Sequence, residues 1–356
     1  MSADLPEATQ TLRDDVRSFV ESSVDPIADD TDRTGTYPAT VLAALGERGW
    51  TGLTLPESNG GAGRSLLDLT VLIEELAVGS MPVASALALN LGVATVIERF
   101  GTDAQRRQYV PEMARFETVG ALGLSERGAG SDKSGIETVA ERDGDEWVLS
   151  GRKRWVTNYP AADVVLTYAR TGPVDDWPTN VSAFLVPTSA FEVDRVWETF
   201  GARSVETVAV GLDDVRVPSG ALVGEEDLAM EQRSQVHTGV NVPARAVGIA
   251  RAALDAARTH VQERAQFGGP LADKQGVRWR LAEMSERVDT GRLLTRRPAR
   301  RVDAGRSVAR AAPMAKIHAT EAAVENANDA MQLLGGVGYT SDSSVGRYLR
   351  DARLLT

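Results

Sequence analysis

Hydrophobic residues in the first third of the chain recur at the spacing of an α-helix. They lie three or four residues apart and so share one helix face; they are Leu12, Val16, Phe19 and Val20. A Gly-rich loop at residues 55–64 interrupts this pattern, and helical spacing resumes over residues 68–76. The pattern predicts an N-terminal helical domain, which we place at residues 1–117.

The 21-residue stretch 77–97 contains no charged residue and could be taken for a membrane span. It is interrupted by Gly, Ser, Pro and Asn, and much of the remainder is alanine. Ser80 followed by Pro82 is typical of a helix start, because a serine side chain can cap the free N–H groups there. We therefore predict a buried helix and no contact with a membrane.

Valine-rich segments replace the helical pattern in the middle of the chain. A hairpin is indicated where Asp143–Gly144 separates two short apolar runs. Further strands are expected at residues 163–169, 181–186 and 205–217. Because helices do not alternate with these strands, a parallel Rossmann-type sheet is not expected. We predict a β domain of barrel type at residues 118–226.

Long Ala-rich segments with helical spacing return after about residue 227. They cover residues 240–264, 271–297 and 311–334, and they predict a bundle of antiparallel helices. The expected fold is thus a multidomain α+β protein. It would combine an N-terminal helical domain, a middle β-barrel-like domain and a C-terminal four-helix bundle at residues 227–356.

Composition excludes several classes of function. The 356-residue chain has a net charge of −11, and such a surface repels nucleic acid. It has no cysteine, which excludes disulfides, thiolate nucleophiles, zinc–thiolate sites and iron–sulfur clusters. No metal site is predicted. Residues 1–10 form no apolar signal segment, and we expect a cytoplasmic protein.

Five groups of residues form motifs in a fixed order along the chain. They are LGLSERGAGSD at 122–132, KRWVTN at 153–158, ERAQFG at 263–268 with LADKQ at 271–275, MQLLGGVGY at 331–339 and YLRDAR at 348–353. In this order and spacing they resemble the acyl-CoA dehydrogenase family over nearly the whole chain. The resemblance implies FAD as the cofactor. It also implies α,β-dehydrogenation of an acyl thioester, carried either by CoA or by a carrier protein.

The first two motifs are expected to hold the flavin ring. The resemblance assigns the cofactor contacts in them to Leu124, Ser125, Gly130, Ser131, Trp155 and Thr157. Ser125 would bond the ring edge, and Ser131 would reach the pyrophosphate or the CoA moiety of the substrate. Trp155 and Thr157 lie two apart in a predicted strand and should share a face, on which the indole forms a wall for the ring. Without the resemblance, the loop is simply a turn, and the Trp–Thr pair simply covers a sheet.

The later motifs are expected to contact FAD bound to a neighbouring subunit. The resemblance assigns its pyrophosphate and adenosine to Arg264, Gln266, Phe267, Gln275, Gln332, Gly335 and Gly336. An arginine offers a fixed fork of donors to a diphosphate. Without the resemblance, Glu263–Arg264 would be a solvated helix end and Gly335–Gly336 a helix stop. A dimer, or a tetramer built as a dimer of dimers, is therefore expected.

The family's catalytic glutamate is missing from both positions where the resemblance places it. One position lies just beyond YLRDAR, where the given sequence stops at Thr356. The other falls on Thr238, followed by Gly239 where the family commonly has an arginine. Neither residue can remove the α-proton, so no catalytic residue is assigned. Other candidates are better explained as solvated or structural side chains; they are Glu226, Asp227, Glu231, His237 and His318.

Three interpretations remain open. The chain could be a subunit of a heteromeric bacterial acyl-CoA dehydrogenase, in which a second such chain supplies the base. It could be a truncated form of an ordinary enzyme. It could also be a non-catalytic homologue that binds FAD or acyl-CoA and stabilises a partner. Other flavin chemistry on the same fold, such as oxidation or hydroxylation, is a further alternative. An electron-transfer flavoprotein is the expected electron acceptor.

Overall fold

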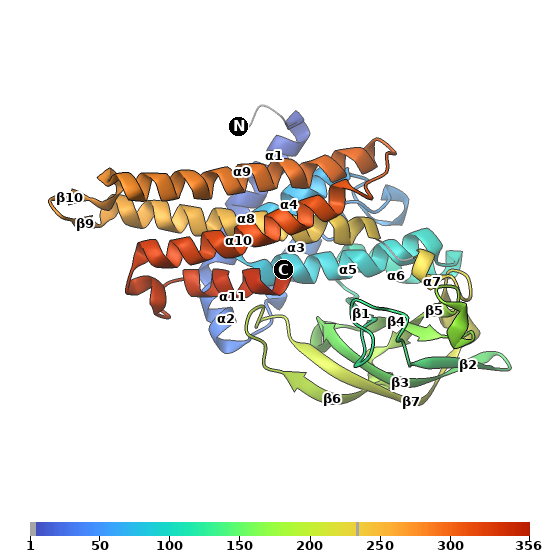
Figure 1. Cartoon of the computed structure of the whole chain (residues 1–356). Helices are drawn as coiled ribbons and strands as arrows, with labels where there is room; N and C mark the ends of the chain where they lie inside the picture. The colour runs from blue at the N-terminus through green and yellow to red at the C-terminus, as the bar shows by residue number, and fades with distance from the viewer. Residues whose placement is uncertain (1–4, 233–234) are drawn as a thin grey trace.

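The structure, a computed structural model, describes residues 5–232 and 235–356, without the side chains of residues 235–238. Long helices run side by side across the upper part of the molecule, and most of the strands gather into one sheet below them (Figure 1). Helices come first along the chain, then the sheet, then the helical bundle. The predicted mixed α+β fold with helical ends and a β middle is confirmed.

The N-terminal part consists of six α-helices, with a π-helical turn (Val20–Val24) between the first two. They are α1 (Glu7–Phe19), α2 (Asp25–Thr34), α3 (Ala39–Glu47), α4 (Leu66–Gly79), α5 (Met81–Phe100) and α6 (Asp103–Ala114). Ser65 and Asp68 form a capping box at the start of α4. Asp303, more than two hundred residues later, also accepts hydrogen bonds from the Leu66 and Leu67 N–H groups at 2.8 and 3.1 Å. The first turn of α4 is therefore fixed by both local and tertiary contacts.

Helix α5 contains most of the uncharged stretch found in the sequence. Ser80 caps it through the Val83 N–H group, and Pro82 lies in its first turn, as predicted. Among the described residues it is the one helix that could span a membrane by length and composition, but 83% of its most apolar window is buried. The prediction of a buried core helix is confirmed.

The middle part is an eight-stranded sheet of mixed orientation. Its strands are β1 (Gly120–Gly123), β2 (Val139–Asp143), β3 (Glu146–Thr157), β4 (Val164–Arg170), β5 (Val181–Pro187), β6 (Glu192–Trp197), β7 (Thr207–Pro218) and β8 (Leu222–Val223). The order is β6-β7-β3-β2-β4-β5-β8, and β1 lies parallel to β4. The predicted hairpin joins β2 to β3, with Gly144 at positive φ in its turn. The sheet provides the frame on which the first two motifs lie.

The two faces of the sheet bury different cores. Along β4, Val164, Leu166 and Tyr168 belong to the large core shared with the helices. The alternate residue Ala169 packs with Trp147 and Phe184 in a separate core enclosed by the sheet itself. This alternation follows from the period of two along a strand. A barrel-like domain thus rests against the helical part through one face of β4.

The C-terminal part is built from four long or medium helices. They are α8 (Gln235–Glu263), α9 (Gln275–Asp303), α10 (Ala311–Leu334) and α11 (Val345–Leu355), and α8 is preceded by the short α7 (Ala229–Gln232). Buried Asn326 on α10 donates to the carbonyls of Ala250 and Met284 at 3.1 and 3.0 Å, which ties α8, α9 and α10 together. A Cβ on Gly248 would lie 2.5 Å from the Glu74 carbonyl oxygen, so α4 and α8 approach too closely for any larger residue.

A cluster of ion pairs joins the N-terminal helices to the bundle. Glu75 pairs with Arg17 at 2.9 Å and with Arg251 at 2.6 Å, while Glu74 pairs with Arg292 at 2.8 Å. Burial opposes ionisation of Glu75, but the Arg251 and Arg17 guanidiniums hold its pKa below the usual range. Removing one member would leave a buried charge unpaired, so the cluster fixes how α1, α4, α8 and α9 meet.

Helix α11 is attached to the rest of the molecule by acidic partners. Asp29 on α2 accepts from Arg347 at 2.8 Å, and Asp32 accepts from Arg350 at 2.9 Å. Asp351 is buried and accepts a hydrogen bond of 2.7 Å from the Ala202 N–H group, in the loop before β7. Burial raises the pKa of Asp351 to about 6.

The Asp351→Asn variant should differ from the wild type in how its stability depends on pH. Because the native pKa is raised above the unfolded value, the wild type loses stability as pH rises from about 4 to about 6. Asparagine keeps a hydrogen-bond acceptor for Ala202 and has no such loss. Denaturant unfolding should show the variant gaining about 3 kcal/mol relative to the wild type between pH 4 and pH 7. Two curves that stay parallel over this range would contradict the assignment.

Candidate active site

A buried ion pair anchors the loop that carries the first motif. The Lys153 side chain is fully buried on β3, and its Nζ donates to Glu126 Oε1 and to the Tyr168 carbonyl, each at 2.5 Å. The Glu126 carboxylate also accepts from the Glu137 N–H group at 2.7 Å. Burial lowers the pKa of Lys153 to about 8. Burial also opposes the charge of Glu126, but Lys153 holds the pKa of that carboxyl below its usual range.

This anchor leaves the predicted flavin-contacting loop exposed at the edge of the sheet. Leu124 and Ser125 directly follow β1 and are half-buried, and the Ser125 carbonyl accepts from the Arg154 N–H group at 2.8 Å. Gly130 and Ser131 are exposed, and no atom lies within 4 Å of the position of a Cβ on Gly130. The loop is therefore held by its buried end while its glycine backbone faces open space, as close approach to a ligand requires.

A β-bulge brings Trp155 to the surface beside this loop. The pairing of β3 with β7 shifts register between Lys153 and Val156, and Trp155 lies between them with φ of +60°. Positive φ is unfavourable for a bulky residue, and such strain gathers at functional sites. The Trp155 side chain is 52% exposed and lies against the Trp197 ring, with 4.6 Å between centroids. The bulge re-aims the indole outward.

The bulge bears on one step of the sequence argument. Trp155 and Thr157 were expected to share a face because they lie two apart in a regular strand, but a bulge precedes Val156 at this point of β3. The half-buried Thr157 exchanges a hydrogen bond of 2.9 Å with Thr207 on β7. The shared face of Trp155 and Thr157 stays a prediction.

The residues of the later motifs gather at the far end of the bundle. A hairpin of β9 (Ala265–Gln266) and β10 (Gly269–Pro270) projects where α8 ends and α9 begins, and α10 ends nearby (Figure 1). The predicted residues there are all at least partly exposed; they are Arg264, Gln266, Phe267, Gln275, Gln332, Gly335 and Gly336. Phe267 at the hairpin tip is 90% exposed, with φ of +53°. Within one chain, this group lies well away from the β1–β3 region (Figure 1).

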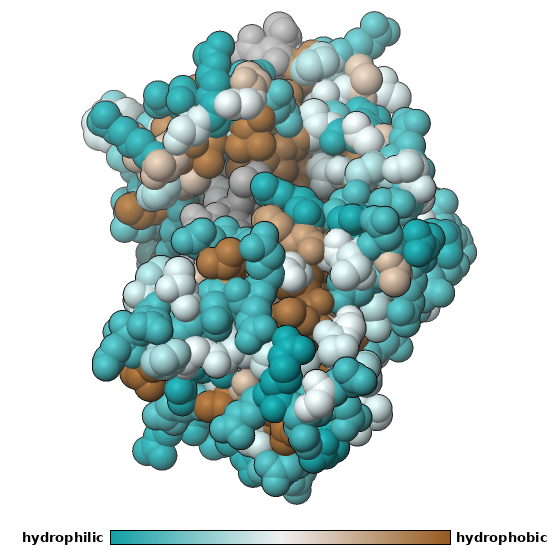
Figure 2. Space-filling view, turned by 90° about the vertical axis from the view of Figure 1, so that its right-hand side faces the viewer, coloured by the Kyte–Doolittle hydropathy of each residue, from teal (hydrophilic) through white to brown (hydrophobic). Residues whose placement is uncertain are grey.

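Of the two expected base positions, one lies beyond the last residue of the given sequence, and the other is Thr238. The side chain of Thr238 lies outside those that the structure describes, as does that of His237. A Cβ on Gly239 would lie 3.0 Å from the Ala312 Cβ on α10, so a side chain there would press against α10. The end of the molecule where α8 begins carries apolar side chains in a recess between polar rims (Figure 2).

The other candidates for the catalytic base are three acidic residues, which have partners elsewhere or lie exposed, and His318. Glu226 pairs with Arg142 at 3.0 Å, and Asp227 accepts from Thr171 at 2.5 Å. Glu231 is exposed on α7. His318 on α10 is not among the predicted flavin contacts, and its Nε2 has no partner among the described residues. None of these four residues makes a hydrogen bond or ion pair with the predicted flavin-contacting loop among the described residues. This agrees with their interpretation as solvated or structural residues.

The sequence argument missed Glu126, Lys153 and Trp197, all of which support the predicted site. A signal was present for Lys153, because the chain has only four lysines and uses arginine for its other cations. Lysine presents a compact point charge on a flexible stem, whereas arginine presents a wider planar fork. Trp197 carried no such signal, since it lies at the end of β6, whose other five residues are exposed.

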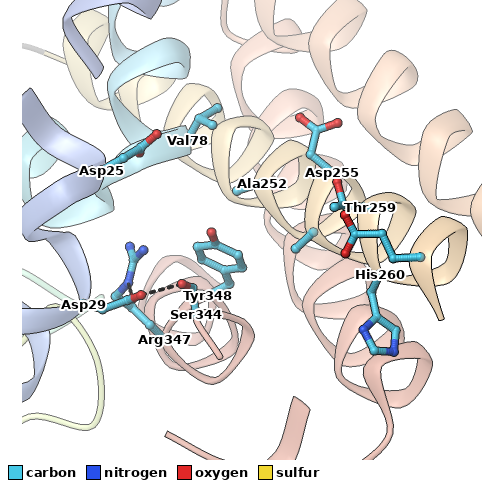
Figure 3. A pocket seen from close by; sticks show the side chains of 12 residues that line it. Asp25, Asp29, Val78, Ala252, Asp255, Thr259, His260, Ser344, Arg347 and Tyr348 are labelled. Atoms are coloured by element: carbon cyan, nitrogen blue, oxygen red, sulfur yellow. Dashed lines mark hydrogen bonds and ion pairs between the residues drawn. The ribbon is translucent and has the colours of Figure 1, made fainter. Parts of the chain in front are cut away.

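A cleft in the described part of the chain is lined by none of these residues. It measures about 470 Å³ and is formed by α2, α4, α8 and α11. Asp25, Asp29, Asp255 and Glu263 contribute carboxylates to it, and Asp29 is engaged by Arg347 and Ser344 (Figure 3). It contains none of the predicted cofactor residues, and we assign no ligand to it.

Comparison with known proteins agrees with this arrangement. Family profiles of the N-terminal, middle and C-terminal domains of acyl-CoA dehydrogenases match residues 6–117, 121–215 and 233–356. A probable acyl-CoA dehydrogenase of Bacillus subtilis, YngJ, is 35% identical, over 100% of this chain and 95% of its own length. The molecule is thus an oxidoreductase of the flavoprotein class. It belongs to the acyl-CoA dehydrogenase family.

Three solved structures share the fold. Butyryl-CoA dehydrogenase from Megasphaera elsdenii has a TM-score of 0.95 at 30% identity, covering 100% of this chain and 95% of its own. A chain from the electron transferring flavoprotein study of Acidaminococcus fermentans has a TM-score of 0.96 at 31% identity, covering 100% and 94%. Glutaryl-CoA dehydrogenase from Mycobacterium smegmatis, in complex with FADH2, has a TM-score of 0.93 at 27% identity, covering 99% and 90%.

The Lys153→Met variant should be destabilised by about 3–5 kcal/mol, because it leaves the Glu126 carboxylate buried and unpaired. The matched control is Arg216→Met, which breaks exposed pairs with Asp143 and Glu146 and should leave stability almost unchanged. Denaturant unfolding measures both. Adding Glu126→Gln to Lys153→Met should recover part of the loss. Equal losses for Lys153→Met and Arg216→Met would contradict the anchoring role of the pair.

Proposed function

We propose that this chain is a subunit of an FAD-dependent acyl-CoA dehydrogenase that acts on an acyl thioester, with its catalytic base supplied by a second chain. The observation that carries the proposal is the strained, outward-facing Trp155, which lies beside a glycine loop anchored by Glu126 and Lys153. A protein that only needed to cover its sheet would have no reason to hold a tryptophan exposed at positive φ.

The residues present fit FAD. At Gly130, Gly335 and Gly336 no atom lies within 4 Å of the point that a Cβ would occupy, so the backbone of both groups is accessible to a ligand. Ser125 and Thr157 offer hydroxyl donors for the ring, and Arg264 with Gln266 and Gln275 offers cationic and amide donors suited to a diphosphate. FAD, when bound, supplies the hydride acceptor for the β-carbon of the acyl group. Trp155 would cover one ring face and help to exclude water.

A neighbouring chain is needed to complete this site. The residues predicted to bind the flavin ring, around β1 and β3, lie far from those predicted to bind the pyrophosphate, at the β9–β10 hairpin of the same chain (Figure 1). One FAD could therefore contact both sets only across an interface between two chains. Large apolar side chains on the bundle also face solvent, notably Trp279 and Leu293 on α9 and Ile317 on α10. These features support a dimer, or a tetramer built as a dimer of dimers.

The possible forms of the enzyme differ in which chain supplies the carboxylate that removes the α-proton. At the family's second base position this chain has Thr238 instead of a carboxylate, and the next residue, Gly239, packs against α10. We therefore assign proton removal to a carboxylate of a second acyl-CoA dehydrogenase chain. Carboxylates beyond Thr356 in a longer form of this chain are the competing source. We retain the predictions of a cytoplasmic location and of an electron-transfer flavoprotein as electron acceptor.

Native mass spectrometry of the tagged protein from its own host should detect FAD and a second, related chain in one complex. Mutating the partner's glutamate should then abolish reduction of FAD by acyl-CoA while leaving the complex and its FAD intact, because only the base is lost. A homo-oligomer that reduces its own FAD with acyl-CoA would contradict the two-chain form. A complex without FAD would favour a non-catalytic homologue.

In a complex whose partner chain has lost its glutamate, the Thr238→Glu variant should restore reduction of FAD by acyl-CoA, because it places a carboxylate at the family's second base position. The matched control is Thr238→Gln, which has similar size and no basic group. Stopped-flow absorbance of the flavin measures the reaction. Equal rates for the two variants would show that position 238 does not face the substrate.

A further inference from the structure

Arg245 on α8 is a half-buried cation between two helices, and burial desolvates its guanidinium. Its Nη1 donates to Ser85 on α5 at 2.6 Å, and its Nη2 donates to Asn241 at 3.1 Å. Both partners are neutral. Its Nε is inaccessible to solvent and has no hydrogen-bond partner among the described residues. Burial alone lowers the pKa of Arg245, to about 10. The guanidinium thus keeps its charge with an unused donor on its Nε side.

This situation differs from that of three other arginines on the helices. Arg251 pairs with Glu75 at 2.6 Å, Arg292 with Glu74 at 2.8 Å, and Arg347 with Asp29 at 2.8 Å. No such ion pair is found for Arg245 among the described residues, and residues 233–238 include no acid. A buried cation without an anion is costly, and proteins usually avoid it.

The position of Arg245 on α8 relates it to the reaction. It lies seven residues after Thr238, the family's second base position, which is two helical turns and about 10 Å along the same face. That position must face the α-carbon of the substrate for a glutamate there to act. An acyl chain extending from the reacting carbon along α8 would therefore approach the Arg245 guanidinium with its distal end.

Helix α5, which carries Ser85, is also connected to the predicted flavin-binding loop. Ser85 lies five residues before Asn90 on α5, and the Asn90 Oδ1 accepts from the Gly120 N–H group at 2.9 Å, at the start of β1. Strand β1 runs directly into Leu124 and Ser125, the predicted flavin contacts. The Arg245–Ser85 pair therefore lies between the two helices that flank the approach to the ring, and not at a remote surface.

We infer that Arg245, together with Ser85, binds a carboxylate at the distal end of the acyl group, so that the substrate is a CoA thioester of a dicarboxylic acid. This inference rests on the proposed function. Arginine binds a carboxylate through two parallel N–H···O bonds, and the free Nε side of Arg245 offers such an edge. The Ser85 hydroxyl would orient the guanidinium. The substrate carboxylate would then be the counter-ion of Arg245, which has no acidic partner among the described residues.

The names of similar proteins do not decide this point, since they refer to both butyryl and glutaryl groups. A simple structural role, in which Arg245 only bridges α5 and α8, makes a different prediction. It requires no preference for an anionic acyl end, and it expects substitutions of Arg245 to affect all thioesters alike.

The experiment compares binding of matched thioesters to the FAD-containing complex as purified. Isothermal titration and the flavin absorbance change measure the affinities of glutaryl-, adipyl- and suberyl-CoA against pentanoyl-, hexanoyl- and octanoyl-CoA. At least one dicarboxylic thioester should bind about tenfold or more tightly than its neutral match, because a site built for a polar group discriminates against its absence. The Arg245→Met variant should lose this preference and retain or improve binding of the neutral thioesters.

Two further variants keep the test independent of folding. Ser85→Ala removes only the hydroxyl and should reduce the preference several-fold, while Arg245→Lys keeps the charge without the fork and should give an intermediate value. Neutral thioesters that bind equally well as, or better than, their dicarboxylic matches would overturn the inference and leave the proposed function standing. A complex that binds no CoA thioester of either kind would overturn both.

Discussion

The ion pair between Glu126 and Lys153 is the interaction on which the candidate site depends. It is buried in the sheet, and it joins the end of β1, the approach to β2 and the middle of β3. A buried pair stabilises little in net terms, because desolvation offsets attraction. Its role is therefore one of position. It holds the glycine loop at a fixed place beside the bulge that turns Trp155 outward, so that the loop and the bulge share one rigid support.

Helix α8 combines the packing of the fold with the chemistry of the site. Gly248 allows α4 to approach closely, Arg251 joins the ion-pair cluster, and Gly239 lies tightly against α10. The same helix carries the second base position at Thr238 and the desolvated Arg245. A residue that served only packing could be apolar at position 245, since a hydrophobic side chain avoids the desolvation of a charge. Retaining a cation there is consistent with a ligand that provides its counter-charge.

Much of the fold was predictable because its signals are local. The span of α10 was predicted as observed, because burial of one helix face leaves apolar residues at helical spacing. Strands β4 and β5 were placed to within one residue, because burial of both faces leaves a short continuous apolar run. The prediction ended α9 near Arg297, before Pro298, whereas the helix continues to Asp303. Pro298 and Ala299 are both buried there, so packing outweighs the backbone hydrogen bond that proline removes. The edge strand β6 was missed because its residues are almost all exposed and leave no alternation.

By itself, the sequence determined the order of the helical and β parts, the family, and which loops and side chains are candidates for FAD. These follow from short motifs and from periodicities of two or 3.6 residues, which need no knowledge of distant contacts. Only the tertiary structure decided that Lys153 is buried on Glu126, that a bulge exposes Trp155, and that Arg245 has neutral partners in the described part of the chain. Each of these depends on which residues, far apart in the chain, are brought together as water is excluded. Burial and charge pairing are properties of that packing and of no single segment.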